Sequence, residues 1–166
     1  MVYGFWGLTV LVPLIGSYQP PGASLLAGIL ILALMILPTV ALTAEAAFKA
    51  VPASYLQGAH ALGMRKAAIA FKVLFPAARQ GLIAGTVLAI TRALGETMAV
   101  LMVTGNVVEM PGSVFDPVRT LTANIELEMA YATGEHRASL FFSGLVLTLL
   151  IVFMVSYVHR REYARP

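Results

Sequence analysis

The sequence predicts an all-α integral membrane protein, and three observations lead to that fold class. Hydrophobic residues make up 59% of its 166 positions and charged residues only 11%, whereas soluble domains average about 45–50% and about 25%. The mean hydropathy of +0.85 indicates more apolar surface than a single core can bury, so lipid is the remaining solvent. The apolar residues also fall into long uninterrupted stretches. The absence of cysteine excludes disulfide scaffolds, Cys-ligated zinc and cysteine nucleophiles.

Three segments are long enough to cross a bilayer, which takes about 20 mostly apolar residues. They are residues 23–44, 81–103 and 139–158, and only the middle one contains charged side chains, Arg92 and Glu96. Pro38 lies inside the first span and is expected to free a backbone carbonyl and kink the helix. Whether that proline is simply tolerated or forms a gating hinge is left open by the sequence.

The N-terminal stretch, residues 2–16, is apolar but too short to span. It is either a re-entrant or interfacial piece or the end of a helix whose beginning is missing, and we prefer the second interpretation. No basic region precedes it, so no cleaved signal peptide is predicted. The run Tyr18-Gln19-Pro20-Pro21-Gly22 then predicts a turn into the first full span.

The charges outside the spans predict the orientation of the chain. The connection 45–80 contains five basic residues and one acid, and three arginines and one acid follow residue 158. The connection 104–138 instead contains five acids and two arginines. Because lysine and arginine are retained in cytoplasmic loops, the sequence places 45–80 and the C-terminus in the cytoplasm and 104–138 outside.

The cytoplasmic connection is patterned as two short helices around Gly63. Ser54 and Gln57 have the spacing of a capping box, which predicts a helix from Ser54 to Leu62, and Gly63 supplies a left-handed residue to end it. A second, amphipathic helix is predicted from Met64 to Pro76. A basic linker at lipid headgroups and a partner-docking element are both compatible with this pattern. The apolar face of the second helix is expected to consist of Ala67, Ala68, Phe71, Leu74 and Phe75.

Arg92 and Glu96 are the candidate pathway residues. Arg92 lies roughly 16 Å along a helix from Gly81, near the bilayer midplane, where each ionised side chain costs roughly 2.5–3.5 kcal/mol. Their i,i+4 spacing places both on one face of a continuous helix, and an intramembrane ionisable pair is a functional-site hypothesis. An internal ion pair that only sets helix register is the alternative. That face also contains the small residues Gly81, Gly85, Ala89, Gly95 and Ala99.

The external connection predicts one amphipathic helix and no metal site. Val118, Leu121, Ile125 and Met129 recur at helical spacing, and this helix either touches an external protein or forms a solvated cap. No metal or cofactor is predicted, because His60, His136 and His159 are separated in sequence and lack clustered carboxylates. The sequence has no GxxxxGK[ST] motif, so nucleotide hydrolysis is expected to come from another chain.

The run QGAHALGMRKAAIAFKVLFP resembles the cytoplasmic loop of bacterial ABC importer permeases, in which an EAA triplet is followed by a glycine and, thirteen residues later, a proline. Gly63 and Pro76 hold that spacing, whereas the triplet reads Gln57-Gly58-Ala59 and lacks the acid. The resemblance implies a type I permease fold with a coupling helix that docks on a cytoplasmic ATPase subunit. Gln57, Gly58, Ala59, Gly63 and Pro76 are its implied coupling residues.

The segment RALGETMAVLMVTGN is similar to the permease subunits of phosphate ABC importers. VYGFWGLTVLVPL, ILPT and TLTANIELE agree with that family in the same order, so the resemblance covers the whole chain. It implies import of inorganic phosphate across the bacterial cytoplasmic membrane, with no enzymatic activity in this chain. The implied partners are a second permease subunit, a cytoplasmic ATPase, an external phosphate-binding protein and membrane lipid, with no nucleic acid. It also implies further spans before residue 1, so that this chain would be the C-terminal part of a longer subunit.

In this interpretation Arg92 donates hydrogen bonds to the crossing oxyanion, because a guanidinium matches its oxygens in bidentate geometry. Glu96 would balance that charge and accept a hydrogen bond from a protonated phosphate. The alternatives are a permease for molybdate or sulfate, and a proton-coupled secondary transporter in which the two residues form the relay. A membrane-embedded enzyme is a further alternative, but the sequence has no nucleophile–base or metal constellation.

Overall fold

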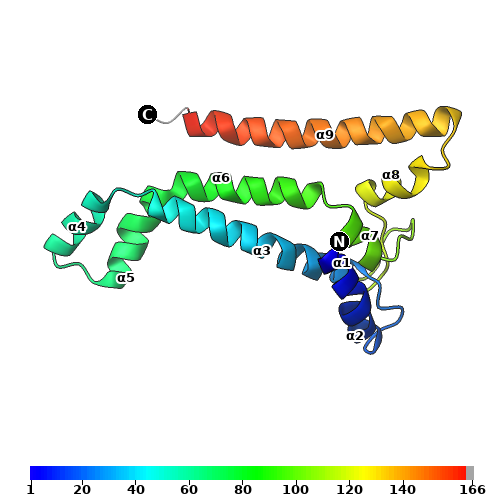
Figure 1. Cartoon of the computed structure of the whole chain (residues 1–166), viewed down its shortest axis with the longest axis horizontal. Coiled ribbons are helices and arrows are strands. Elements are labelled where there is room, and N and C mark those ends of the chain that lie inside the picture. The colour runs from blue at the N-terminus through cyan, green and yellow to red at the C-terminus, as the bar shows by residue number, and fades with distance from the viewer. Residues whose placement is uncertain (164–166) are drawn as a thin grey trace. The chain divides into compact units, whose positions relative to one another are not determined.

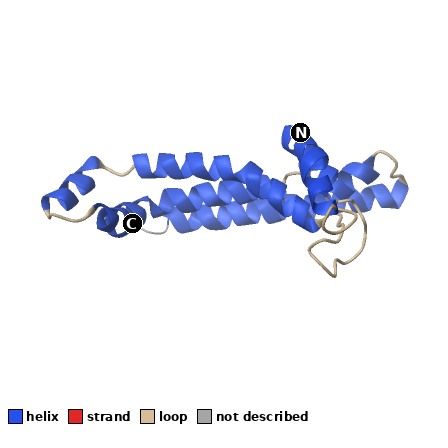
Figure 2. Cartoon of the chain, turned by 90° about the horizontal axis from the view of Figure 1, so that it is seen from below, coloured by secondary structure: helices blue, strands red, loops and turns tan. Residues whose placement is uncertain are grey.

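A computed structural model describes residues 1–163. The described chain is helical, with connecting loops and no strand (Figure 2); its extended pairing is an isolated bridge between Gly105 and Val118. It divides into two compact units. The first comprises Met1–Ile36 and Arg92–Phe153, and the second Leu37–Thr91 with the C-terminal end of the last helix.

Among the described residues, three helices are long and apolar enough to cross a membrane: Leu25–Lys49, Lys66–Leu94 and Gly134–Tyr157. The first is α3 (Leu25–Lys49), which continues through Pro38. The last belongs to α9 (Gly134–Tyr163). The N-terminal helix Val2–Gly16 is shorter and consists of α1 (Val2–Trp6), a π turn η1 (Gly7–Leu11) and α2 (Val12–Gly16).

The connection 45–80 contains α4 (Ala53–Ala61) and the first part of a second helix, which continues beyond the connection. The predicted capping box is wrong: Pro52 occupies the N-cap position and no side chain caps the helix. The predicted helix end at Pro76 is also wrong, because α5 (Lys66–Ile69), the π turn η2 (Ala70–Leu74) and α6 (Phe75–Leu94) form one helix. In the π turn the Phe75 N–H donates to the Ala70 carbonyl, and such a register shift accommodates a proline within a helix.

The predicted apolar face of this helix stays partly exposed within the chain. Phe71 is 77% exposed, whereas Ile69, which the pattern did not include, is 5% exposed. α4 packs against α5 and η2, and Ile69 is the buried residue of α5.

The short helix α7 (Met98–Val103) ends the predicted span 81–103, and the connection 104–138 that follows it contains a loop and α8 (Leu121–Met129). The Thr120 hydroxyl accepts a hydrogen bond from the Ala123 N–H at 3.3 Å and caps α8. Val118 lies before the helix in the bridge with Gly105, and Leu121 is exposed while Ala123 is fully buried. The helix that the sequence predicts is present, but its buried face centres on Ala123.

The first unit has its core where the N-terminal helix meets α3 and α7. Its buried centre is formed by Ile15, Ala27, Ile31, Ala99 and Val103. A Cβ at Gly4 would lie 2.7 Å from the Ala99 Cα, so the absence of a side chain allows α1 to approach α7 this closely. The loop after α7 closes over the start of α3, since Asp116 and Val114 carbonyls accept the Leu25 and Leu26 N–H groups at 3.0 and 2.9 Å. The otherwise unpaired first donors of α3 are thereby satisfied.

The second unit consists of the end of α3, the α4–η2 segment and most of α6. Here α6 lies alongside α3 (Figure 1), and small residues set the spacing of the two helices. A Cβ at Gly81 would lie 2.7 Å from the Ala47 Cβ, and one at Gly85 would lie 2.5 Å from the Thr43 hydroxyl oxygen. The Phe48 and Phe75 rings meet at the end of this pair that leads to α4, with centroids 6.5 Å apart. This is the close small-residue packing expected between helices in a membrane.

Candidate functional site

Arg92 lies in the last turn of α6 with its side chain exposed. A cation at this position is favoured by the partial negative charge at a helix C-terminus. Within the part of the chain that the structure describes, no carboxylate lies within ion-pair distance of the guanidinium. Arg92 therefore presents a free set of hydrogen-bond donors.

Glu96 lies in a break between two helices, so the predicted continuous helix over 81–103 is wrong. α6 ends at Leu94 and α7 begins at Met98. The Glu96 carboxylate accepts a hydrogen bond from the Ala99 N–H at 3.2 Å, which satisfies one of the unpaired donors at the start of α7. The predicted shared helix face of Arg92 and Glu96 therefore does not exist, and the structure shows no ion pair between them among the described residues.

A third residue positions the break. The Thr122 hydroxyl of α8 donates to the Glu96 carbonyl at 3.1 Å, so that α8 is tied to the segment between α6 and α7. Sequence reasoning missed this arrangement because it extended one apolar span across the segment. The signal was present: Gly95 favours the end of a helix, and an acid three residues before Ala99 favours the start of the next one.

An ionic cluster forms around Glu128, and it includes His136, which the sequence suggested was isolated. Arg119 donates to one oxygen of the Glu128 carboxylate at 2.9 Å, and His136 Nε2 lies 3.1 Å from the other oxygen. The hydrogen bond from His136, followed by the one from Arg119, lowers the pKa of the Glu128 carboxyl. Arg119 also donates to the Asn106 carbonyl at 3.0 Å. His136 thus pairs with a single carboxylate, and the described residues contain no group of three or more His, Asp or Glu side chains placed to hold a metal ion.

The implied coupling residues lie in two settings. Gln57 and Gly58 are exposed on α4, and Ala59 is buried where α4 packs on η2. Gly63 follows α4 with a φ of +68°, in open space, as expected of a glycine that ends a helix. Pro76 is exposed two residues into α6, inside the continuous helix.

Residues 2–161 match the family of binding-protein-dependent transport system inner membrane components. The chain belongs to this family. It is 41% identical to the "Probable ABC transporter permease protein YqgH" of Bacillus subtilis, over 98% of this chain and 55% of that protein. It is 34% identical to the phosphate transport system permease protein PstC of Mesorhizobium japonicum, over 99% of this chain and 58% of that protein. No solved structure matches the chain significantly.

The chain thus spans little more than half the length of these curated relatives. Membership in the binding-protein-dependent family confirms the predicted type I permease fold of ABC transporters. It also makes the chain part of a multi-pass membrane protein, in agreement with its three apolar helices. Proteins of this family are the membrane subunits of ABC transporters and lack an ATPase site of their own.

Proposed function

We propose that the chain forms part of the permease subunit of an ABC importer for inorganic phosphate. The observation that supports this most directly is its similarity to PstC proteins, which covers 94–99% of the chain for those of Pasteurella multocida and Mesorhizobium japonicum. The partners in this proposal are a second permease subunit, a cytoplasmic ATPase and an external phosphate-binding protein. The ATPase would supply the energy, since the chain has no phosphate-binding loop of the GxxxxGK[ST] type.

Arg92 is the proposed phosphate contact along the pathway. Its exposed guanidinium has no ion-pair partner among the described residues, and its planar donors match two oxygens of a tetrahedral anion. Burying an unpaired cation in a membrane segment is costly, so a transient anionic ligand gives the residue a physical rationale.

Glu96 has a different proposed role from the one that the sequence suggested. One of its carboxylate oxygens caps α7 through the Ala99 N–H, so the residue holds the break that follows Arg92. The other oxygen can accept a hydrogen bond from a protonated phosphate, a donor that sulfate lacks at neutral pH. In this proposal Glu96 has two roles: one carboxylate oxygen holds the pathway segment in place, and the other contributes to the choice of anion.

ATP-driven uptake of labelled phosphate by the assembled transporter tests these roles. Arg92→Ala and Arg92→Lys are each expected to reduce uptake at least tenfold. Alanine removes the charge and the donors, and lysine keeps the charge but loses the bidentate geometry. Arg79→Lys, at an exposed arginine of the same helix, is the matched control and is expected to transport normally. Near-normal uptake by both Arg92 variants, with normal assembly, would remove Arg92 from the pathway.

The α4 segment is the proposed docking element for the ATPase, and we place it with the C-terminus in the cytoplasm on the basis of the basic residues around it. Its surface exposes large apolar side chains, Tyr55 at 56% and Leu62 at 81%. Exposed apolar residues in a polar loop are typical of a protein-contact surface. Gln57 and Gly58 lie exposed on the same short helix.

Co-purification with the ATPase subunit tests this docking surface. Leu62→Asp is expected to abolish co-purification, because the change places a charge in an apolar contact. Val108→Asp is the control, since Val108 is 72% exposed in the other connection and is expected to leave ATPase binding intact. Retention of the ATPase by the Leu62 variant, or its equal loss in both variants, would contradict the assignment.

A further inference from the structure

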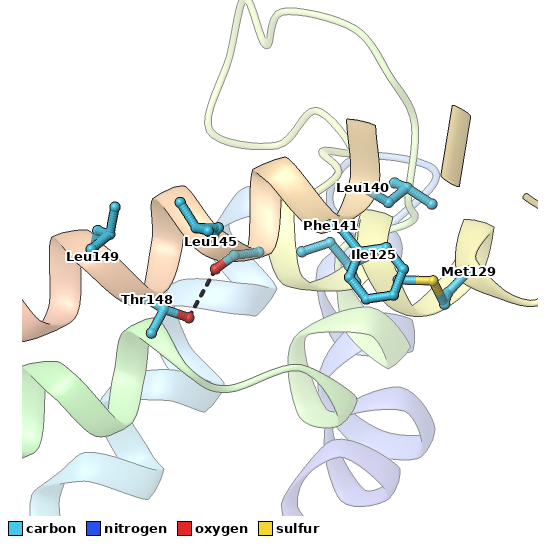
Figure 3. A pocket seen from close by; sticks show the side chains of 8 residues that line it. Ile125, Met129, Leu140, Phe141, Leu145, Thr148 and Leu149 are labelled. Atoms are coloured by element: carbon cyan, nitrogen blue, oxygen red, sulfur yellow. Dashed lines mark hydrogen bonds between the residues drawn. The ribbon is translucent and has the colours of Figure 1, made fainter. Parts of the chain in front are cut away.

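The strongest unassigned feature is an apolar groove of about 700 Å³ between α8 and the first half of α9. It lies within the first compact unit. Figure 3 shows Ile125 and Met129 of α8 with side chains from successive turns of α9 around it. The α9 side of the groove is formed by Leu140, Phe141, Gly144, Leu145, Thr148 and Leu149.

The groove is lined by apolar side chains and, at Gly144, by a residue without a side chain. The Thr148 hydroxyl donates to the Gly144 carbonyl at 2.9 Å. Its proton is therefore already used within α9, and the methyl group is the part of Thr148 that can contact an apolar occupant. A Cβ at Gly144 would have its nearest neighbour, the Ile125 Cδ1, at 3.7 Å. The volume is in the range of about 300–1,000 Å³ typical of ligand sites, and the lining favours a hydrocarbon occupant.

The position of the groove along α9 matches one leaflet of a bilayer. Leu140 and Leu149 are nine positions apart, so the groove follows the helix for roughly 14 Å. Half of a hydrocarbon core of about 30 Å is roughly 15 Å. The charge-free stretch of α9 begins immediately after Arg137, so the groove starts at the hydrocarbon boundary and ends near the bilayer centre.

A cation lies at the headgroup end of the groove. The Arg137 guanidinium carbon is 5.9 Å from the centroid of the Phe141 ring, and Phe141 lines the groove. Arg137 has no ion pair among the described residues, and the nearby Glu128 carboxylate is engaged by Arg119 and His136. The adjacent Glu135 is the remaining acid of this turn. Arg137 is therefore free to bind an anionic group at the membrane surface.

We propose that this groove binds a single phospholipid in the leaflet on the side of α8. One acyl chain occupies the groove between α8 and α9, and the lipid phosphate pairs with Arg137. A straight acyl chain parallel to a spanning helix accounts for the length of the groove, its apolar lining and the cation at one end. Another membrane helix would account for the apolar lining but not for the cation at the headgroup level.

Native mass spectrometry of the purified permease with added phosphatidylglycerol tests the site. Gly144→Leu fills the groove and is expected to lose the bound lipid, whereas Val146→Leu, on an exposed α9 residue outside the groove, keeps it. Arg137→Gln is expected to weaken lipid binding about tenfold, the effect of one charge-assisted hydrogen bond. Arg160→Gln, an exposed arginine near the other end of α9, is its control. Equal lipid retention by Gly144→Leu, Arg137→Gln and the controls would overturn the proposal.

A second measurement reports directly on what occupies the groove. The chain has no cysteine, so Thr148→Cys and Val152→Cys each introduce a unique site for a fluorescent label. In the assembled transporter, spin-labelled phosphatidylglycerol is expected to quench the label at position 148 more than at 152, and unlabelled lipid should compete only at 148. Equal quenching at both positions, or protection of position 148 by another subunit, would overturn the lipid assignment.

Discussion

Two glycines at α4 show how single residues decide local structure here. Gly58 lies inside α4 and Gly63 lies two positions after its last residue, and a Cβ at either position would meet no atom within 4 Å. Only Gly63 has a positive φ, +68°. The two positions therefore share an environment but differ in backbone conformation. The role of Gly63 could be predicted from the sequence, because a glycine after an apolar periodic stretch is a common helix end.

The same substitution should act with opposite sign at the two glycines. Gly58→Ala is expected to stabilise α4 by about 0.5–1 kcal/mol, since alanine loses less conformational freedom in a helix. Gly63→Ala is expected to destabilise the segment by about 1–2 kcal/mol, since a Cβ clashes in the left-handed region. Hydrogen exchange of the α4 amides measures both effects. Equal changes of the same sign would contradict the assigned backbone of Gly63.

The ionic cluster of Arg119, Glu128 and His136 predicts a pH dependence. The pKa of the Glu128 carboxyl is lowered by its hydrogen bonds from His136 and Arg119. A lowered pKa stabilises the fold at pH values above the unfolded-state pKa of about 4.3, and this contribution is lost as the pH falls through the folded-state pKa below it. Melting temperatures between about pH 3 and 7 should therefore fall more steeply for the wild type than for Glu128→Gln.

Glu126→Gln is the control for that experiment. Glu126 lies on the same helix, is exposed, and has no ion pair among the described residues. The Glu126 variant is expected to keep the wild-type pH profile. Parallel profiles for all three proteins would show that the cluster does not contribute to stability.

At the scale of elements, the sequence predicts which segments are helical better than where they end. Long apolar stretches locate α3, the helix containing α6, and α9, because hydrophobic length is a strong signal. The two wrong boundaries lie at Pro76 and Gly95, and they err in opposite directions. Hydropathy predicts one helix through Gly95, although Glu96 caps a new helix there. The rule that proline ends a helix fails at Pro76, because a π turn precedes it. The helix break at Gly95 and the continuation through Pro76 both depend on specific hydrogen bonds that composition does not encode.

The pairing of α3 with α6 makes an element-scale prediction. A Cβ at Gly81 would lie 2.7 Å from the Ala47 Cβ, so Gly81→Ala forces two backbones apart and is expected to cost about 1–3 kcal/mol. Ala47→Gly removes that Cβ, so the double variant Gly81→Ala, Ala47→Gly should recover much of the loss. Thermal unfolding in detergent measures the coupling between the two changes. Additive effects of the two substitutions would contradict the contact.

At the scale of the whole molecule, the candidate site was predicted only in part. The residues Arg92 and Glu96 follow from the cost of charges in an apolar span, but their separation and the capping role of Glu96 required the structure. The Arg119–Glu128–His136 cluster joins residues from a loop, α8 and α9, and no local pattern brings these together. Family membership rests on the match over residues 2–161, whereas phosphate as the transported anion is our proposal.

The proposed substrate is tested most directly by uptake measured with the assembled transporter in sealed vesicles containing ATP. We expect labelled phosphate to accumulate only with ATP present, and excess unlabelled phosphate, but not sulfate or molybdate, to suppress that accumulation. Glu96→Gln should weaken the discrimination against sulfate, because the acceptor for a protonated phosphate is altered. ATP-independent accumulation driven by a proton gradient, or suppression by sulfate or molybdate equal to that by phosphate, would contradict the assignment of this chain to a phosphate ABC importer.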